Sequence, residues 1–335
     1  MVLASLLILC TGLAFAPRID IAEATMSTDV TFYIKADGNV HPQPAPISTS
    51  DNVTYTFSAG WTYLGGNSAL VVERDNIAID GAEFTLRGKA PNSNGITLVG
   101  RTNVTLKNAV ITEFSRGIWL SGSSNNTIMG SDIASNLYGV ELDRSSRNAI
   151  CQNNIVGSSM PGIWLHGESA NNNSIVENNI TSNYYGVRIT ESSSNFLGGN
   201  IVADNYNPGI VFTGFSDNNT IVGNNLTANA GYGLMLYESS DNLFYHNNVR
   251  DNGKTVYIGT SGYANFWNSS IEGNYWSDYA GSDSTRDGLG DVPYAADANN
   301  TDYHPLMGVF SEFSATSEHH VQIVSNSSIF GFHFT

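Results

Sequence analysis

Apolar and variable residues alternate in a short motif that recurs along most of the chain. Each copy begins with a glycine, followed by an aliphatic residue, a variable residue and a large apolar residue, as in Gly117-Ile118-Trp119-Leu120. The glycines lie 22 to 24 residues apart, at Gly95, Gly117, Gly139, Gly162, Gly186, Gly209 and Gly233. Because side chains alternate between the two faces of a strand, this pattern indicates strands with one buried face.

Two rows of polar residues recur with the same period. The first row consists of Asn103, Asn126, Asn148, Asn173, Asn195, Asn219 and Asn242. The second row follows five residues later and consists of Asn108, Ser131, Asn153, Asn178, Asn200, Asn224 and Asn247. Apolar residues such as Ile150 and Ile155 follow each row and indicate two further strands. Asparagine suits the corners between strands, because it tolerates left-handed backbone and its amide can bond the equivalent asparagine of the next repeat.

Three short strands per repeat predict an all-β fold, a right-handed parallel β-helix with about eight coils of 22 to 24 residues and a cap at each end. Each strand is expected to pair in register with its counterpart one coil later, about 4.8 Å away. A leucine-rich repeat has a similar period and is the structural alternative. It requires regularly placed leucines and often a helical segment, whereas the apolar positions here are mixed and β-branched.

The pattern divides the chain into five segments. The apolar run from Val2 to Ala16 is too short for a membrane span and precedes small residues typical of a cleavage site, which indicates a signal peptide and export. The predicted segments are a signal peptide (1–24), N-terminal strands and a cap (25–69), the parallel β-helix (70–276), an acidic Gly/Asp loop and cap (277–308), and the start of a further, truncated β-module (309–335). No membrane span is expected in the mature chain.

Composition and charge narrow the range of partners. The formal net charge of -16, from 30 acidic and 14 basic residues, argues against nucleic acid and acidic membranes, since these need clustered Lys and Arg. Neutral sugars, cations or another protein are compatible with such a surface. Cys10 lies in the predicted signal peptide, so Cys151 would be the single cysteine of the mature chain and no intrachain disulfide is expected.

Ten Asn-x-Ser/Thr triplets predict a glycoprotein if the host attaches sugars to asparagine, although a chain this rich in Asn and Ser produces such triplets readily. They begin at Asn52, Asn103, Asn125, Asn172, Asn179, Asn218, Asn225, Asn268, Asn299 and Asn326.

Several segments together resemble the NosD-type β-helix repeat family. They are the Asn-rich coils, the entry segment 71–77 (VVERDNI), the exit segment 273–279 (GNYWSDY), the stretch 287–294 (DGLGDVPY) and the stretch 302–307 (DYHPLM). The resemblance covers about residues 30 to 308 and is more specific for fold than for activity. It implies a carbohydrate-binding or sugar-hydrolysing type of β-helix, common among archaeal surface and secreted proteins.

The residues that differ between coils are the candidates for function. On the glycine-led strands, the second and fourth residues after glycine should point outward, which places Trp119, Glu141, Trp164 and Arg188 in one stripe and Ser121, Asp143, His166 and Thr190 in the next. Aromatic rings beside charged groups are suited to sugars, so we predict a ligand-binding stripe of Trp119, Glu141, Asp143, Trp164, His166 and Arg188. A plain solvated face whose large side chains pack on one another is an equally open interpretation.

A catalytic version of the same stripe is the sharper hypothesis. Asp143 and His166 would form an acid/base pair, with Arg188 steadying a uronate and Glu141 as a further carboxylate. The fold hosts pectate lyases, polygalacturonases and alginate epimerases, but the Asn-Thr-Asp, Asp-Asp and Gly-His-Gly motifs of the polygalacturonase type are absent.

Metal sites are less well supported by the residues. Asp283, Asp287 and Asp291 lie in a Gly-bearing loop with Asp278 and Asp297, and are a possible calcium site or a plain acidic turn. The family name suggests copper, because the nitrous oxide reductase maturation protein NosD is copper-associated. Copper favours grouped His, Cys and Met, whereas the histidines here are scattered apart from the pair 319–320, so the residues do not support copper.

The leading hypothesis is an exported, monomeric cell-surface or secreted protein, in an extracellular or periplasmic-type compartment, that requires no cofactor. It would bind polysaccharide or another envelope protein without catalysis. The alternatives are a polysaccharide lyase, hydrolase or epimerase acting on the outward face of the helix, and a NosD-like copper-associated maturation factor.

Overall fold

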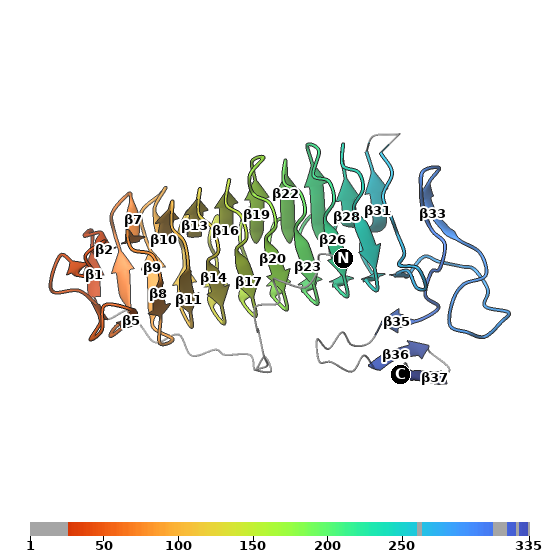
Figure 1. Cartoon of the computed structure of the whole chain (residues 1–335), viewed down its shortest axis with the longest axis horizontal. Helices are drawn as coiled ribbons and strands as arrows, with labels where there is room; N and C mark the ends of the chain where they lie inside the picture. The colour runs from red at the N-terminus through yellow and green to blue at the C-terminus, as the bar shows by residue number, and fades with distance from the viewer. Residues whose placement is uncertain (1–25, 260–262, 311–319, 326–327, 334–335) are drawn as a thin grey trace.

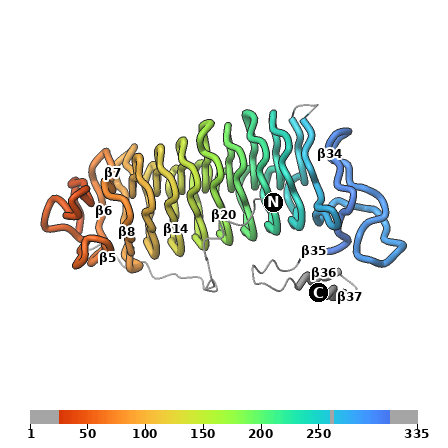
Figure 2. Tube along the Cα trace, viewed as in Figure 1, coloured from red at the N-terminus to blue at the C-terminus, as the bar shows by residue number. Residues whose placement is uncertain are grey.

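Three parallel sheets wrap around one elongated core and form a right-handed β-helix (Figure 1). The structure, a computed structural model, describes residues 26–259 and 263–310, and the backbone of residues 320–325 and 328–333. The predicted signal peptide therefore lies outside the described residues. Each coil contributes one strand to each sheet, and the trace in Figure 2 advances by one coil at a time from the N-terminal to the C-terminal end.

Sheet A contains eleven strands. In spatial order they are β1 (Met26–Thr28), β6 (Trp61–Tyr63), β9 (Thr85–Gly88), β12 (Val110–Thr112), β15 (Asp132–Ala134), β18 (Asn154–Val156), β21 (Asn179–Thr181), β24 (Ile201–Ala203), β27 (Asn225–Thr227), β30 (Asn248–Arg250) and β32 (Tyr275–Trp276).

Sheet B carries the glycine-led strands and also contains eleven strands. They are β3 (Val40–His41), β2 (Phe32–Ile34), β7 (Ser68–Val72), β10 (Asn94–Val99), β13 (Arg116–Ser121), β16 (Tyr138–Asp143), β19 (Ile163–His166), β22 (Val187–Thr190), β25 (Ile210–Thr213), β28 (Tyr232–Leu236) and β31 (Lys254–Ile258).

Sheet C contains ten strands and completes each coil. From the N-terminal end they are β4 (Ile47–Ser48), β5 (Thr54–Phe57), β8 (Ile77–Asp80), β11 (Val104–Lys107), β14 (Thr127–Met129), β17 (Ala149–Cys151), β20 (Ser174–Val176), β23 (Phe196–Gly198), β26 (Thr220–Val222) and β29 (Leu243–Tyr245).

The solenoid has about ten turns, so the expectation of about eight is too low. Parallel pairing already begins in the N-terminal segment, where β1 pairs with β6, β2 with β7, and β5 with β8. These strands lack the Gly-aliphatic motif, which is why the sequence pattern predicts a cap here and not further coils. Two short strands, β3 and β4, pair antiparallel with β2 and β5 at this end. At about 4.8 Å per coil, the stack is roughly 45 to 50 Å long.

The glycine column of sheet B has a steric cause. A Cβ on Gly139 would lie 2.4 Å from the carbonyl oxygen of Gly162 in the next coil, and one on Gly117 would lie 2.7 Å from that of Gly139. A side chain at this position would therefore force neighbouring coils apart, which is why the glycine recurs in each copy of the motif.

Buried asparagine ladders hold the corners. The Asn148 Oδ1 atom accepts hydrogen bonds from both the backbone N–H and the side-chain amide of Asn126, at 3.0 Å each. The same geometry continues along both predicted rows, with one correction at the start of each row. The Val104 N–H donates to Asn126 and the Ala109 N–H to Ser131, so Asn103 and Asn108 lie one residue outside their rows.

A third row, which the sequence pattern did not predict, lies before sheet B. Its buried members are Asn136, Ser158, Asn183, Asn205 and Asn229, and the half-buried Asn252 ends it.

Aromatic residues fill the core at both ends of the described solenoid. Trp61 lies in the N-terminal end, and Trp267 and Trp276 lie in the C-terminal end, each at most 1% exposed. Beyond them, β33 (Tyr294–Asp297) and β34 (Asn300–Asp302) form an antiparallel hairpin, visible at the C-terminal end in Figure 1. The strands β35 (Val309–Phe310), β36 (His320–Ser325) and β37 (Ser328–His333) form a separate antiparallel sheet. Within the described residues, no helix is long and apolar enough to cross a membrane.

Candidate functional site

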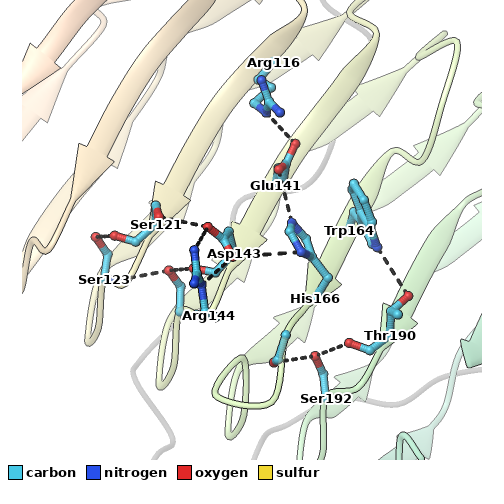
Figure 3. A network of polar contacts seen from close by, with 12 residues as sticks. Arg116, Ser121, Ser123, Glu141, Asp143, Arg144, Trp164, His166, Thr190 and Ser192 are labelled. Carbon is cyan, nitrogen blue, oxygen red and sulfur yellow. Dashed lines mark hydrogen bonds and ion pairs between the residues drawn. The ribbon is translucent and has the colours of Figure 1, made fainter. Parts of the chain in front are cut away.

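The outward face of sheet B brings the predicted site residues together in the expected register. Trp119, Glu141, Trp164 and Arg188 are successive partners on β13, β16, β19 and β22. Ser121, Asp143, His166 and Thr190 are successive partners one pleat further along. We call this surface the sheet B face. Figure 3 shows the polar contacts at its centre.

Glu141 lies beneath the sheet B face and not on it. Its residue surface is only 3% exposed, although its strand position points outward. The Arg116 Nε atom donates to Oε2 at 2.7 Å, and the His166 Nε2 atom lies 3.1 Å from Oε1 (Figure 3). A carboxylate with both oxygens engaged in this way is suited to fixing Arg116 and His166 in position, and less suited to contacting a polymer.

Asp143 is the more accessible carboxylate. Ser121 Oγ donates to Oδ2 at 2.9 Å, and Arg144 forms a two-pronged ion pair with both oxygens at 2.9 Å (Figure 3). The hydrogen bond from Arg144 lowers the pKa of the Asp143 carboxyl below its ordinary value, and Ser121 adds to this effect. The His166 Nδ1 atom lies 3.9 Å from Asp143 Oδ1. The imidazole is thus held between two carboxylates.

The aromatic side chains of the face pack on one another. The Trp164 ring stacks with Tyr138 at 5.4 Å and with His166 at 4.1 Å between centroids. The guanidinium of Arg116 lies 5.3 Å from the centre of the Trp119 ring, and that of Arg188 lies 5.8 Å from the centre of the Trp164 ring. Cation–π contacts of this kind fix the orientation of both partners.

Two donors on this face lack a partner. Trp119 Nε1 and Arg188 Nε are buried and make no hydrogen bond with any part of the chain that the structure describes. An unpaired buried donor costs about 1–3 kcal/mol, which a ligand oxygen could recover if the side chain turned outward.

The residues that precede the glycine in each copy of the motif also belong to the site, although the glycine-led pattern did not predict them. Arg116 and Tyr138 occupy this position and complete the polar and aromatic contacts described above. One residue earlier, at the same corner, Leu137 and Tyr184 are each 41% exposed, and Tyr206 of a later coil is 69% exposed. The signal was available, because these positions recur every 22 to 25 residues. They add exposed apolar side chains along the edge of the face, with Ser159 at the equivalent position between Leu137 and Tyr184.

A second group of tyrosines lies on the same sheet nearer its C-terminal end. Tyr257 on β31 packs against Tyr232 at 5.2 Å and Tyr237 at 5.4 Å between ring centroids. The hydrogen bond with Tyr257 raises the pKa of Tyr237. Lys254 lies 5.5 Å from the centre of the Tyr232 ring. Beyond Arg188, sheet B therefore carries a second aromatic group, which Val211 and Thr213 on β25 separate from the first.

The predicted calcium ligands hold their own loop together. Asp283 accepts the backbone N–H groups of Asp287 and Gly288, at 3.2 and 3.0 Å. Asp291 accepts the N–H of Ser284 at 2.6 Å. In the described parts of the chain, no group of three His, Cys, Asp or Glu residues is arranged to hold a metal ion. Calcium binding by these residues stays a prediction.

The histidines whose side chains the structure describes likewise do not form a copper centre. His166 is engaged by Glu141, and the Nε2 atom of His246 lies 2.7 Å from Glu272 Oε2 while its ring stacks on Phe310 at 4.1 Å. The side chains of the pair 319–320 lie outside the described residues. The donor set within the described residues therefore does not fit the grouped His, Cys and Met that copper prefers.

Comparison with known proteins identifies the family and the fold. The family model described as periplasmic copper-binding protein (NosD) matches residues 25–161 and 76–281. The A-module of the mannuronan C-5 epimerase AlgE4 from Azotobacter vinelandii is similar in structure, with a TM-score of 0.53 at 16% identity, over 68% of this chain and 70% of that chain. Tailspike protein 2 of an Escherichia coli O157:H7 bacteriophage has a TM-score of 0.51 at 13% identity, over 63% of this chain and 34% of that chain. At such identities the likeness shows the fold alone. No curated protein matches the chain in sequence.

Proposed function

Because the chain belongs to the NosD family, whose model is described as periplasmic, we propose that it is an exported β-helix protein that binds polysaccharide on the sheet B face. The observation that carries the proposal is the clustering of aromatic and charged side chains on β13 to β22, next to exposed Leu137, Tyr184 and Tyr206. The epimerase and tailspike neighbours share this fold, and the epimerase is named for its action on mannuronan. Carbohydrate surfaces typically combine rings for the apolar side of a sugar with charged groups for its hydroxyls.

One guanidinium without an ion-pair partner in the described part of the chain favours an acidic polysaccharide. Three arginines lie on or beside the face, Arg116, Arg144 and Arg188, against the three carboxylates Glu141, Asp143 and Glu191, the last at the position equivalent to Arg144 two coils later. Counting His166 as neutral, three minus three leaves a local formal charge of zero in a chain whose net charge is -16. Arg188 lies on the outward stripe without an ion-pair partner among the described residues, so it is the best-placed guanidinium for a uronate carboxylate.

Binding without catalysis is the reading that the geometry supports best. Glu141 is buried and both of its carboxylate oxygens have polar partners, and Asp143 accepts hydrogen bonds from Ser121 and Arg144. A general acid or base must come within hydrogen-bond distance of the reacting group, and the Glu141 carboxylate, 3% exposed with both oxygens engaged, is poorly placed for this role.

The exposed tyrosines provide the sharpest test of binding. Purified protein is screened on a glycan array and against uronate polymers, and affinities are then measured for Tyr184→Ala and Tyr206→Ala. Each variant should weaken binding about 2- to 10-fold, as expected for loss of one ring contact. Tyr303→Ala is the matched control, because Tyr303 is 62% exposed in the C-terminal loop away from the face. The proposal fails if no glycan binds, or if all three variants bind equally well; a pull-down that recovers only an envelope protein would assign the face to that partner.

One observation keeps catalysis as a second candidate. The His166 imidazole lies 3.1 Å from one carboxylate and 3.9 Å from another, an arrangement that can move a proton. Incubation with mannuronan and with neutral glycans, followed by NMR for epimerisation and by detection of unsaturated or new reducing ends, tests it. Activity that disappears in His166→Gln while binding is retained would establish the enzyme; unchanged polymer would exclude these reactions.

Two further expectations are tested separately. Equilibrium dialysis with Cu(I) and Cu(II) examines the copper-associated alternative, for which no described residue group provides a centre. Light scattering of the purified protein examines the expected monomer.

A further inference from the structure

One exposed corner of the solenoid carries asparagine at six of nine successive coils. The corner joins sheet B to sheet C, and its residues have the left-handed backbone conformation, with φ between 54° and 59°. All of them are exposed. We call these nine positions the corner row: Asn52, Asn76, Asn103, Asn125, Arg147, Asn172, Ser194, Asn218 and Asp241.

The residue two positions after each corner lies on the outward face of sheet C. It is a hydroxyl residue at five of the corners, namely Thr54, Thr105, Thr127, Ser174 and Thr220. At the other four corners it is apolar, namely Ala78, Ala149, Phe196 and Leu243. Every hydroxyl follows an asparagine, and Arg147, Ser194 and Asp241 are all followed by an apolar residue.

The fold explains the asparagines at the corners but not the hydroxyl residues two positions later. A left-handed corner favours asparagine, because its short polar side chain tolerates positive φ. It places no demand on the residue two positions later, which sits on an outward strand position where apolar residues are also accommodated. The coupling of Asn with Ser or Thr is instead the acceptor motif for N-linked glycosylation.

From this coupling we propose that Asn52, Asn125, Asn172 and Asn218 are N-glycosylation sites. In the described residues, the Asn52, Asn172 and Asn218 side chains make no hydrogen bond, and Asn125 makes only a 3.3 Å contact with Ser124. Their amides are therefore available for modification.

Hydrogen bonds in the folded chain engage the amides of three other triplets, those that begin at Asn103, Asn179 and Asn268. Asn103 donates its amide to Asn76 at 2.9 Å and lies one coil from Asn125, about 4.8 Å, which is too close for two glycans. Asn179 is bonded to Asn154 at 2.8 Å, and Asn268 to the Ser269 carbonyl at 2.6 Å.

Spacing along the row suits separate glycans. Asn125, Asn172 and Asn218 lie on alternate coils, about 10 Å apart, and Asn52 lies three coils before Asn125.

The asparagine Nδ2 would attack the anomeric carbon of a lipid-linked glycosyl phosphate or diphosphate in the presence of a transferase. A C–N bond forms, the C–O bond to phosphate breaks, the phosphate leaves with the lipid, and the amide loses one proton. The glycans would coat one edge of the solenoid and leave the sheet B face uncovered. The inference rests on export, but not on polysaccharide binding.

Mass spectrometry of the protein isolated from its own cells tests the proposal. Peptides containing Asn52, Asn125, Asn172 and Asn218 should carry glycans, and those containing Asn179 and Asn268 should not. Thr127→Val keeps the β-branched shape but removes the hydroxyl, so the intact mass should fall by one glycan. Thr127→Ser retains the motif and should keep the glycan, which makes it the matched control.

Unmodified corner peptides, or glycans confined to Asn179 and Asn268, would overturn the inference. So would a Thr127→Val protein that keeps its full mass. If the corner peptides of the native protein are unmodified while recombinant, unglycosylated protein binds polysaccharide through Tyr184 and Tyr206, then the corner inference alone has failed and the proposed function stands.

Discussion

Asn200→Ala should cut a buried ladder in the middle of the solenoid. Asn200 Oδ1 accepts the backbone N–H and the side-chain amide of Asn178, both at 3.0 Å. Its own amide donates to the Ile175 carbonyl and to Asn224 Oδ1, both at 2.8 Å. Alanine removes all four bonds and leaves the Asn178 N–H buried without an acceptor in the described structure.

The size of the loss follows from these contacts. A buried donor without a partner costs about 1–3 kcal/mol, and each of the other three bonds contributes about 0.5–1.5 kcal/mol. Alanine is easier to bury than an amide, which offsets about 2 kcal/mol. We therefore expect Asn200→Ala to lower the free energy of unfolding by about 3 kcal/mol. Asn200→Ser should lose about 1 kcal/mol less, because the chain already uses Ser131 in this row, where its hydroxyl accepts the Ala109 N–H at 3.2 Å.

Urea unfolding followed by tryptophan fluorescence measures both variants. Asn207→Ala is the matched control, since Asn207 makes no side-chain hydrogen bond with the described residues, and it should stay within about 0.5 kcal/mol of the unmodified protein. The ladder argument is refuted if Asn200→Ala is no less stable than Asn207→Ala, or if serine and alanine at position 200 are equivalent.

Three other outcomes follow from the charged groups. The pKa of Asp143 is lowered in the folded chain, so its carboxylate stabilises the fold when the pH is above the unfolded pKa near 3.8, and this contribution disappears as the pH falls through the folded pKa. Asp143→Asn should therefore flatten the acid side of a plot of melting temperature against pH. Burial raises the pKa of Asp302, so its contribution to the stability of the fold is fully present below pH 3.8 and is lost as the pH rises through the folded pKa. Asp302→Asn should remove this decline in melting temperature, and an unchanged plot of melting temperature against pH would contradict the assignment. Arg116→Met should lower the free energy of unfolding by about 2 kcal/mol, because it leaves the buried Glu141 with His166 as its remaining partner. In a double-mutant cycle, Arg116→Met/Glu141→Gln should recover part of this loss.

The fold was predictable because every coil repeats the same local requirements. The glycine column marks where neighbouring strands approach closely. At Gly139, for example, a Cβ atom would clash with the carbonyl oxygen of Gly162. The in-register pairing of Trp119 with Glu141, and of Glu141 with Trp164, followed from the period alone and is confirmed. The number of coils was underestimated because the first parallel strand of sheet B, β2, buries Phe32 and Ile34 without the glycine-led motif.

Details within each coil were harder to predict. Asn103 and Val104 are adjacent, and only the hydrogen bond from the Val104 N–H to Asn126 shows which of them belongs to the ladder. The burial of Glu141 was missed for a similar reason. Strand alternation gives the direction of a side chain, but its exposure depends on the neighbours that fold over it, here Arg116 and His166.

The ionic-strength dependence of binding connects the site to the charge of the whole chain. A net charge of -16 repels an acidic polymer at long range, whereas Arg188 would attract it only within a few ångströms. The Debye length is about 30 Å at 0.01 M salt and about 8 Å at 0.15 M, so moderate salt screens the repulsion first. A uronate polymer should therefore bind best at intermediate ionic strength, and a neutral glycan held by Tyr184 and Tyr206 should be nearly insensitive to salt. This difference separates the two ligand classes even before the ligand is identified.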